Sequence, residues 1–279
     1  MECRYEKIVF GDENSFYGNY KNPPIPEGYE YVCGKWHNGF VIERNSDGSQ
    51  FVWIPVGSLD SNGILDEVSY EEKFGRRNHL NEEEEIQFSE KQFHEPLVEE
   101  LANQFKSVRE YGGFYISRYN ISKNEETGKP QSVKGAIPYL NINFDIAKET
   151  AALLEQSDTV KSHLTFGAEY DSVLEWLIKS KAKTRKMIAE DSTQWGNQAN
   201  TENRPRKVTK TGSCEQWEIN RIYDLSGNVA EWTQEQYSKS HHVVRGGTCK
   251  DYCPVAFRYF VDENESYEYA GFRATLYIE

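Results

Sequence analysis

Ile222-Tyr-Asp-Leu-Ser-Gly-Asn-Val-Ala-Glu-Trp232 places Gly and Asn inside an apolar and aromatic run and follows them at once with Glu and Trp. A strand built for burial would avoid Gly and Asn, and a helix interior disfavours both. The segment therefore predicts a strand that runs into a tight turn, with Asn228 in an unusual backbone conformation. Glu231 is expected to be at least half-buried, and it then needs an arginine, backbone N–H groups or a metal ion as its partner.

The composition of the chain limits its class and its partners. With 279 residues, 37% of them hydrophobic, the chain is long enough for one large domain or two small ones. The 45 acidic residues outnumber the 32 lysines and arginines, and the net charge of −13 disfavours general binding to nucleic acid or to anionic membranes. We find no secretory signal and no apolar run of transmembrane length, and the odd number and wide spacing of the five cysteines disfavour a disulfide framework. A cytoplasmic location is expected by default, with release or association with a particle left open.

Hydrophobic patterning predicts a mixture of helices and short strands. Alternation predicts strands over 29–32, 39–44, 50–55 and 112–119. Apolar residues at helical spacing predict helices over 95–106, 145–154 and 166–177. The residues expected to face the core from these helices are Leu97, Leu101, Phe105, Ile146, Ala147, Ala151, Leu154, Tyr170, Leu174 and Leu177. The rest of the chain carries short strands, loops and most of the Trp residues, which indicates an α+β protein with much irregular structure.

Several short motifs occur in an order that is more specific than any of them alone. They are Phe51-Val-Trp-Ile-Pro55, Gly113-Phe-Tyr-Ile-Ser-Arg-Tyr119, Leu164-Thr-Phe-Gly-Ala-Glu-Tyr170, Trp195-Gly-Asn197, Tyr223-Asp-Leu-Ser-Gly-Asn-Val-Ala-Glu-Trp232, Arg245-Gly-Gly-Thr248 and Gly271-Phe-Arg273. In this order the chain resembles the formylglycine-generating-enzyme (sulfatase-modifying factor) superfamily. The resemblance implies a C-type-lectin-like α+β fold with two main helices and short antiparallel strands over residues 51–279. Residues 1–50 are expected to form an N-terminal extension whose hairpin packs on that core.

Some members of this superfamily are copper-dependent oxidases that convert a peptide cysteine into formylglycine, and under that alternative Cys249 and Cys253 would be the copper ligands. Cu(I) prefers soft thiolates. In the oxidases the two cysteines lie soon after a Gly-Gly-Ser and are separated by four residues. Here Cys249 directly follows Gly246-Gly-Thr248, and only three residues separate it from Cys253. This offset favours two unpaired cysteines, and the scattered histidines similarly disfavour the iron-dependent sulfoxide synthases of the superfamily.

Other members are non-catalytic ligand-binding proteins whose C-terminal segment is diversified by retroelements in phages and bacteria, and the segment 248–270 resembles theirs. It is rich in Tyr, Phe, Asp, Asn and Ser, which offer contact area and adaptable hydrogen bonds. Alternation makes Phe257 and Tyr259 candidates for the core. The residues expected on an exposed face are Cys249, Lys250, Asp251, Tyr252, Tyr267 and Tyr269, and together with Thr248 they make up the predicted ligand-binding set.

In some superfamily members the Ser-Gly-Asn-Val-Ala-Glu segment also helps to hold a calcium ion. Asn228 and Glu231 would supply hard oxygens, with the carbonyl groups of Gly227 and Val229 beside them. The equal alternative is that Glu231 pairs with Arg245 or Arg273 and binds no ion. The sequence thus favours a non-catalytic binding protein with a macromolecular ligand, in the first place a protein. The alternatives are the copper oxidase and a structural subunit of a phage or injection particle.

Overall fold

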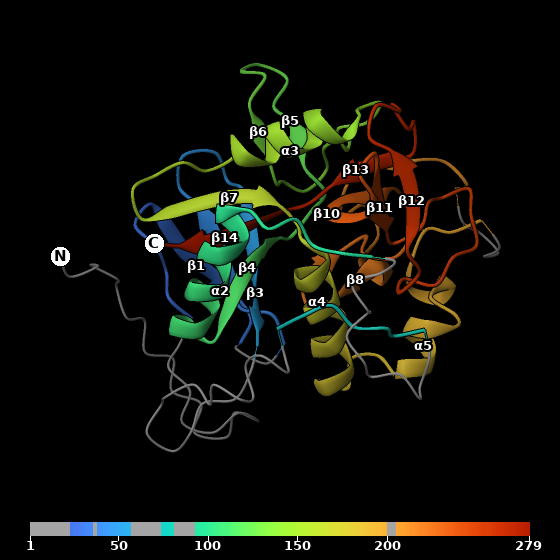
Figure 1. Cartoon of the computed structure of the whole chain (residues 1–279). Coiled ribbons are helices and arrows are strands. Elements are labelled where there is room, and N and C mark those ends of the chain that lie inside the picture. Colours follow the sequence, from blue (N-terminus) through green and yellow to red (C-terminus); the bar gives the residue numbers. More distant parts are fainter. Residues whose placement is uncertain (1–22, 36–37, 57–73, 81–92, 200–204) are drawn as a thin grey trace.

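The computed structural model describes residues 23–35, 38–56, 74–80, 93–199 and 205–279. Figure 1 shows two β-sheets beside each other, with helices packed around them. This is the α+β class that the sequence predicts. Within these ranges, no helix is both long enough and apolar enough to cross a membrane.

The larger sheet has six strands and joins the two ends of the described chain. All neighbouring pairs are antiparallel, and the spatial order is β1 (Tyr29–Cys33), β2 (Val41–Arg44), β3 (Gln50–Pro55), β4 (Gly113–Ser117), β14 (Ala274–Ile278) and β7 (Val160–Leu164). The strand nearest the C-terminus thus lies between β4 and β7. Both β4 and β14 are buried along their whole length, which explains why they read as continuous apolar and aromatic runs.

The smaller sheet carries the C-terminal motifs. Its order is β12 (Tyr259–Asp262), β11 (His241–Arg245), β10 (Ala230–Ser238) and β13 (Ala270–Phe272), and the β10–β13 pair is parallel. Two short hairpins accompany it, β5 (Ser122–Lys123) with β6 (Pro130–Gln131), and β8 (Glu218–Ile219) with β9 (Ile222–Tyr223). The predicted strand before the Gly-Asn turn is therefore β9, and β10 follows the turn.

The helices cover the sheets and bridge them. They are α2 (Glu99–Tyr111), α3 (Phe144–Ala152), α4 (Gly167–Lys179) and α5 (Arg185–Ala189), with 3-10 turns at Thr193–Trp195 and Glu215–Trp217. Helix α2 packs on β4 and β14, whereas α4 contacts both β3 and β10. At the start of α4 the backbone N–H of Phe166 donates to Glu169 Oε2 at 2.7 Å, which satisfies a donor that the helix itself leaves open. Helix α4 thus links the larger sheet to the smaller one.

Two predicted core positions lie at the surface instead. Leu97 is 99% exposed because α2 begins only at Glu99, and Leu97 lies in the turn that follows Pro96. Ile146 is 39% exposed because the buried face of α3 runs through Ala147 and Ala151, four residues apart. The other core residues predicted on these helices are buried or partly buried.

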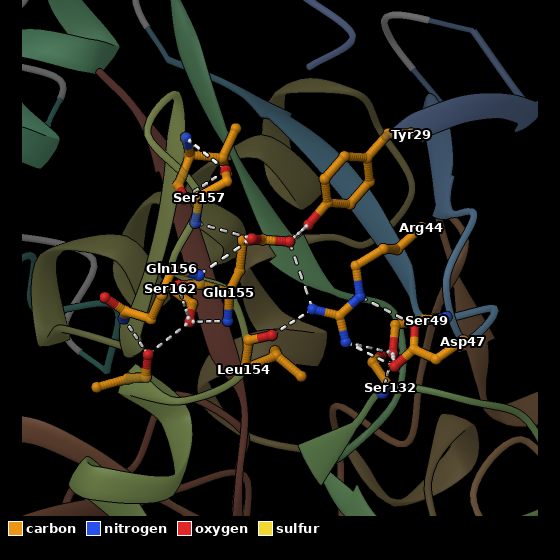
Figure 2. Close-up of polar contacts among 12 residues, drawn as sticks. Tyr29, Arg44, Asp47, Ser49, Ser132, Leu154, Glu155, Gln156, Ser157 and Ser162 are labelled. Atoms are coloured by element: carbon orange, nitrogen blue, oxygen red, sulfur yellow. Dashed lines mark hydrogen bonds and ion pairs between the residues drawn. The ribbon is translucent and has the colours of Figure 1, made fainter. Parts of the chain in front are cut away.

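The hairpin β1–β2 is attached to the body by a polar cluster as well as by strand pairing (Figure 2). Tyr29 donates its hydroxyl to Glu155 Oε2 at 2.7 Å, and Arg44 donates to the Leu154 carbonyl and pairs with Asp47 at 2.6 Å. Glu155 follows α3, so these contacts fix the hairpin to the connection between α3 and β7. Burial, together with the neighbouring Glu155 carboxylate, raises the pKa of Tyr29 well above its usual value. The hairpin belongs to the same sheet as the strands that follow it. The predicted boundary at residue 50, between the N-terminal extension and the domain, therefore remains a prediction.

Candidate ligand-binding site

The Gly-Asn turn positions the loop that follows β11. Gly227 and Asn228 have φ angles of 74° and 66°, which confirms the unusual backbone predicted for Asn228. The backbone N–H of Gly227 donates to the Gly246 carbonyl at 2.8 Å, and the carbonyl of Asn228 accepts from the N–H of Cys249 at 3.1 Å. The motif at 222–232 therefore fixes the position of the Arg-Gly-Gly-Thr loop through these two backbone hydrogen bonds.

Glu231 pairs one of its two carboxylate oxygens with an arginine, while its Oε2 is buried without a hydrogen-bond partner among the described residues. Arg273 Nε donates to Glu231 Oε1 at 2.7 Å, and Asn120 Nδ2 donates to the same oxygen at 2.8 Å. Arg245, the other predicted partner, lies opposite Glu231 in the β10–β11 register but bonds instead to Asp171 at 2.9 Å. Burial raises the pKa of Glu231, and the Arg273 cation acts against that rise.

The same contacts bear on the calcium hypothesis. Asn228 Oδ1 accepts from the N–H and the hydroxyl of Thr209, at 2.9 and 3.1 Å, and from Asn197 Nδ2 at 3.2 Å. A calcium site needs six to eight oxygens with lone pairs directed at the ion. Here N–H and O–H donors point at Asn228 Oδ1 and the Arg273 guanidinium points at Glu231 Oε1, so neither of these two oxygens is free to bind calcium. Glu231 Oε2 keeps its lone pairs, and a calcium ion at this turn stays a prediction. Over the described ranges no group of three or more His, Cys, Asp or Glu side chains is arranged to hold a metal ion.

A buried ionic cluster lies beneath the C-terminal segment. Asp171 on α4 accepts from both Arg245 and Arg258, and Glu235 on β10 accepts from Arg258 Nε at 2.9 Å on each oxygen. Burial alone would raise the pKa of Asp171, but the two guanidinium groups hold it below its usual value. Charges buried in this way persist only when they are paired. The cluster therefore fixes Arg258 with its side chain directed inward.

The inward direction of Arg258 explains where its neighbours lie. Adjacent residues of an extended chain face opposite sides. Phe257 and Tyr259 are accordingly 42% and 56% exposed, so their predicted place in the core is wrong. The sequence did not reveal this, because Asp171 and Glu235, which are the acidic partners of Arg258, are far from Arg258 along the chain.

The exposed rings border a hollow of about 240 Å³ at this end of the smaller sheet. Its lining residues are Ala230, Val244, Gly247, Thr248, Asp251, Tyr252, Cys253, Phe257, Tyr259 and Tyr267. Four of the seven predicted ligand-binding residues are among them, namely Thr248, Asp251, Tyr252 and Tyr267. Thr248 donates its hydroxyl to Asp251 Oδ2 at 2.7 Å, which orders the carboxylate at the rim.

The other three predicted residues lie outside this lining. Cys249 is fully buried, so its predicted exposure is wrong, and its N–H bond to the Asn228 carbonyl holds it against the turn. Lys250 is exposed, with its Nζ 5.8 Å from the centre of the Tyr269 ring, and Tyr269 is half-buried. Phe257, Tyr259 and Cys253 are lining residues that the predicted ligand-binding set did not include.

A second hollow of about 180 Å³ adjoins the first. It is lined by His241, Tyr259, Phe260, Val261, Asp262, Glu265 and Tyr267. Tyr259 and Tyr267 line both hollows, so the two form one continuous surface. Burial, and then the negative charge of Asp251 and Glu265 among others, raises the pKa of Tyr267 to about 12.

Comparison with known proteins identifies the family. The model of the sulfatase-modifying factor enzyme 1-like domain matches residues 42–277. The chain belongs to this sulfatase-modifying factor family. No curated protein matches it. Among solved structures, PvdO from Pseudomonas aeruginosa is similar at 13% identity with a TM-score of 0.48, covering 85% of this chain and 97% of PvdO.

Two further structures are similar to this member of the family over a smaller part of its length. A crystal structure of CarF is 17% identical with a TM-score of 0.43, covering 60% of this chain and 87% of CarF. Treponema denticola variable protein 1 is 14% identical with a TM-score of 0.38, covering 59% of this chain and 84% of that protein.

The two cysteines of the oxidase alternative have different surroundings in this family member. Cys253 lines the first hollow, whereas Cys249 does not. Burial and then the Asp251 charge raise the pKa of Cys253 to about 11, and burial also raises the pKa of Cys249. Both groups are therefore thiols near neutral pH, and a copper ion would have to displace their protons.

Proposed function

We propose that this sulfatase-modifying factor family member is a non-catalytic binding protein that holds a protein ligand against its C-terminal segment. The observation that carries the proposal is the group of exposed rings around the hollow: Tyr252, Phe257 and Tyr259 are 52%, 42% and 56% exposed. Exposure of aromatic side chains to water is unfavourable, and groups of exposed aromatic side chains are typical of binding surfaces. Its C-terminal segment also resembles that of the retroelement-diversified binding proteins.

The size of the hollow supports a macromolecular ligand. Pockets for cofactors and drug-sized molecules enclose roughly 300–1,000 Å³, and the first hollow has about 240 Å³. It is large enough for one side chain of a partner, while the exposed rings around it contact the partner's surface. The ordered base of the segment, built on Arg258 and the Gly-Asn turn, supports binding without a large rearrangement.

A peptide selection tests this proposal. A displayed library of random peptides is panned on the wild-type protein, and enriched peptides are measured against the variant Tyr252→Ser/Tyr259→Ser. Leu153→Ser is the matched control, because Leu153 is 70% exposed and lies outside the lining of both hollows. We expect about tenfold or greater loss of affinity in the tyrosine variant, since buried aromatic anchors dominate interfaces. Equal affinities for the two variants would place binding elsewhere and refute the proposal.

The copper oxidase is the alternative, and Cys253 in the lining of the hollow is the observation in its favour. The test is a titration of the reduced protein with Cu(I) against a competing chelator, with Cys249→Ser and Cys253→Ser measured in parallel. Our proposal expects the wild type to compete no better than either variant. Tight one-to-one binding that both substitutions abolish would replace the binding protein with the oxidase.

A further inference from the structure

The two adjoining hollows combine aromatic walls with acidic rims. Tyr259 and Tyr267 line both hollows. Asp251 is in the lining of the first hollow, and Asp262 and Glu265 are in the lining of the second. Tyr259 and Glu265 are exposed, and Tyr267 is half-buried. The face of an aromatic ring carries negative electrostatic potential, so the rings and the carboxylates here both attract a positively charged ligand.

The arginines near this surface do not neutralise it. Arg245 is fully buried and Arg258 is 6% exposed, and both direct their guanidinium groups inward to Asp171 and Glu235. Lys250 is the exposed cation of this loop, and its Nζ lies over Tyr269, which lines neither hollow. The two arginines thus serve the buried cluster and Lys250 lies over a ring outside both linings, which leaves His241, in the lining of the second hollow, as the one basic side chain that the described linings contain.

From this charge complementarity the geometry points to a basic, extended segment of a partner protein as the ligand, with one Lys or Arg side chain in each hollow. The inference rests on the proposed function and names the chemistry of its ligand. One cation lies between the Tyr259 and Tyr267 rings beside Asp251, and the next lies beside Asp262 and Glu265. A cation over an aromatic face and a carboxylate beside it act on the same group, and an arginine satisfies both because its flat guanidinium stacks while donating.

The probe for the test is a fluorescein-labelled peptide of alternating arginine and glycine, compared with the same peptide carrying glutamine for arginine. Binding is measured by fluorescence anisotropy at about 0.05 M and about 0.3 M salt, which differ in screening. The variants are Asp251→Asn and Tyr259→Leu, the second of which keeps an apolar side chain but removes the ring. Glu126→Gln is the matched control. Glu126 is an exposed acid in the turn between β5 and β6, and its substitution removes the same charge as Asp251→Asn.

We expect the arginine peptide to bind more tightly than the glutamine peptide, with affinity falling as salt rises. Asp251→Asn should weaken binding about fivefold, and Tyr259→Leu about two- to fivefold, with Glu126→Gln unchanged. Equal losses in Asp251→Asn and Glu126→Gln would show attraction to the net charge alone and overturn the inference.

Two further outcomes also overturn it while separating it from the proposed function. If spermidine displaces the peptide as effectively as unlabelled peptide does, the surface is a site for small amines. If the panned peptides are apolar and still lose affinity in Tyr252→Ser/Tyr259→Ser, the binding function stands and its basic ligand is wrong.

Discussion

Arg273→Met is the substitution for which the structure gives the largest expected effect on stability. Arg273 is fully buried and donates to Glu231 Oε1 at 2.7 Å, to the carbonyls of Ser117 and Arg118 at 3.0 and 3.1 Å, and to the Tyr223 carbonyl. Its removal leaves the Glu231 carboxylate buried without its cation, which costs about 3–5 kcal/mol. Protonation of Glu231 limits the loss, so we expect about 4 kcal/mol near neutral pH.

The measurement is urea unfolding followed by tryptophan fluorescence. The control is Lys186→Met, which removes an exposed cation 3.8 Å from Glu190 and should cost under about 0.5 kcal/mol. Because the carboxylate is penalised only when ionised, the cost of Arg273→Met should shrink as pH falls toward 4. Glu231→Leu/Arg273→Met should be more stable than Arg273→Met alone, since neither charge is then unpaired. A single-variant loss under about 1 kcal/mol, or additive losses in the double variant, would refute this account.

Three other perturbations follow from the site and its support. Burial, and then the charge of Glu235, raises the pKa of Glu95 to about 8 from 4.5. Its contribution to stability is therefore full below pH 4.5 and is lost as pH rises through 8, so Glu95→Gln should be relatively more stable at pH 9 than at pH 5 in urea unfolding; parallel pH profiles would contradict this. Gly227→Ala should cost more than about 2 kcal/mol, because its Cβ would lie 2.3 Å from the Asn197 carbonyl oxygen at a φ of +74°; Gly128→Ala, at +70° with open space around it, is the control, and equal losses would show that φ alone matters. Adding millimolar calcium after EDTA should leave the melting temperature unchanged, and a rise of several degrees would restore a calcium site at the Gly-Asn turn.

The fold was largely predictable because its elements carry local signals. The strands at 50–55 and 113–117 and the helix α4 agree with the patterns that predicted them. The motif at 223–232 was informative because its Gly-Asn pair is needed for local geometry, as the positive φ of Asn228 shows. Helix α2 begins later than predicted. Leu97 has the spacing of the apolar helix positions, but it lies before the first helical residue.

The polar interior was less predictable. Glu231 had two candidate arginines, and strand register alone would have favoured Arg245, its neighbour across β10 and β11. The choice of Arg273 depends on Asp171 on helix α4, which pairs with Arg245 at 2.9 Å. Likewise, the outward direction of Phe257 and Tyr259 depends on the buried partners of Arg258. Sequence pattern alone does not reveal partnerships between charges so far apart in the chain.

The central place of β14 in the six-stranded sheet constrains how this protein is made. Strand β4 pairs with β3 on one side, but its other side has no partner until residues 274–278 are made. Strand β7 pairs with the same residues, and over the described ranges it has no other neighbour in that sheet. During translation both strands therefore present unsatisfied backbone groups until those residues have emerged from the ribosome. A message truncated a few codons before them would yield a product with two open strand edges, which is the kind of nascent chain that chaperones and proteases must intercept.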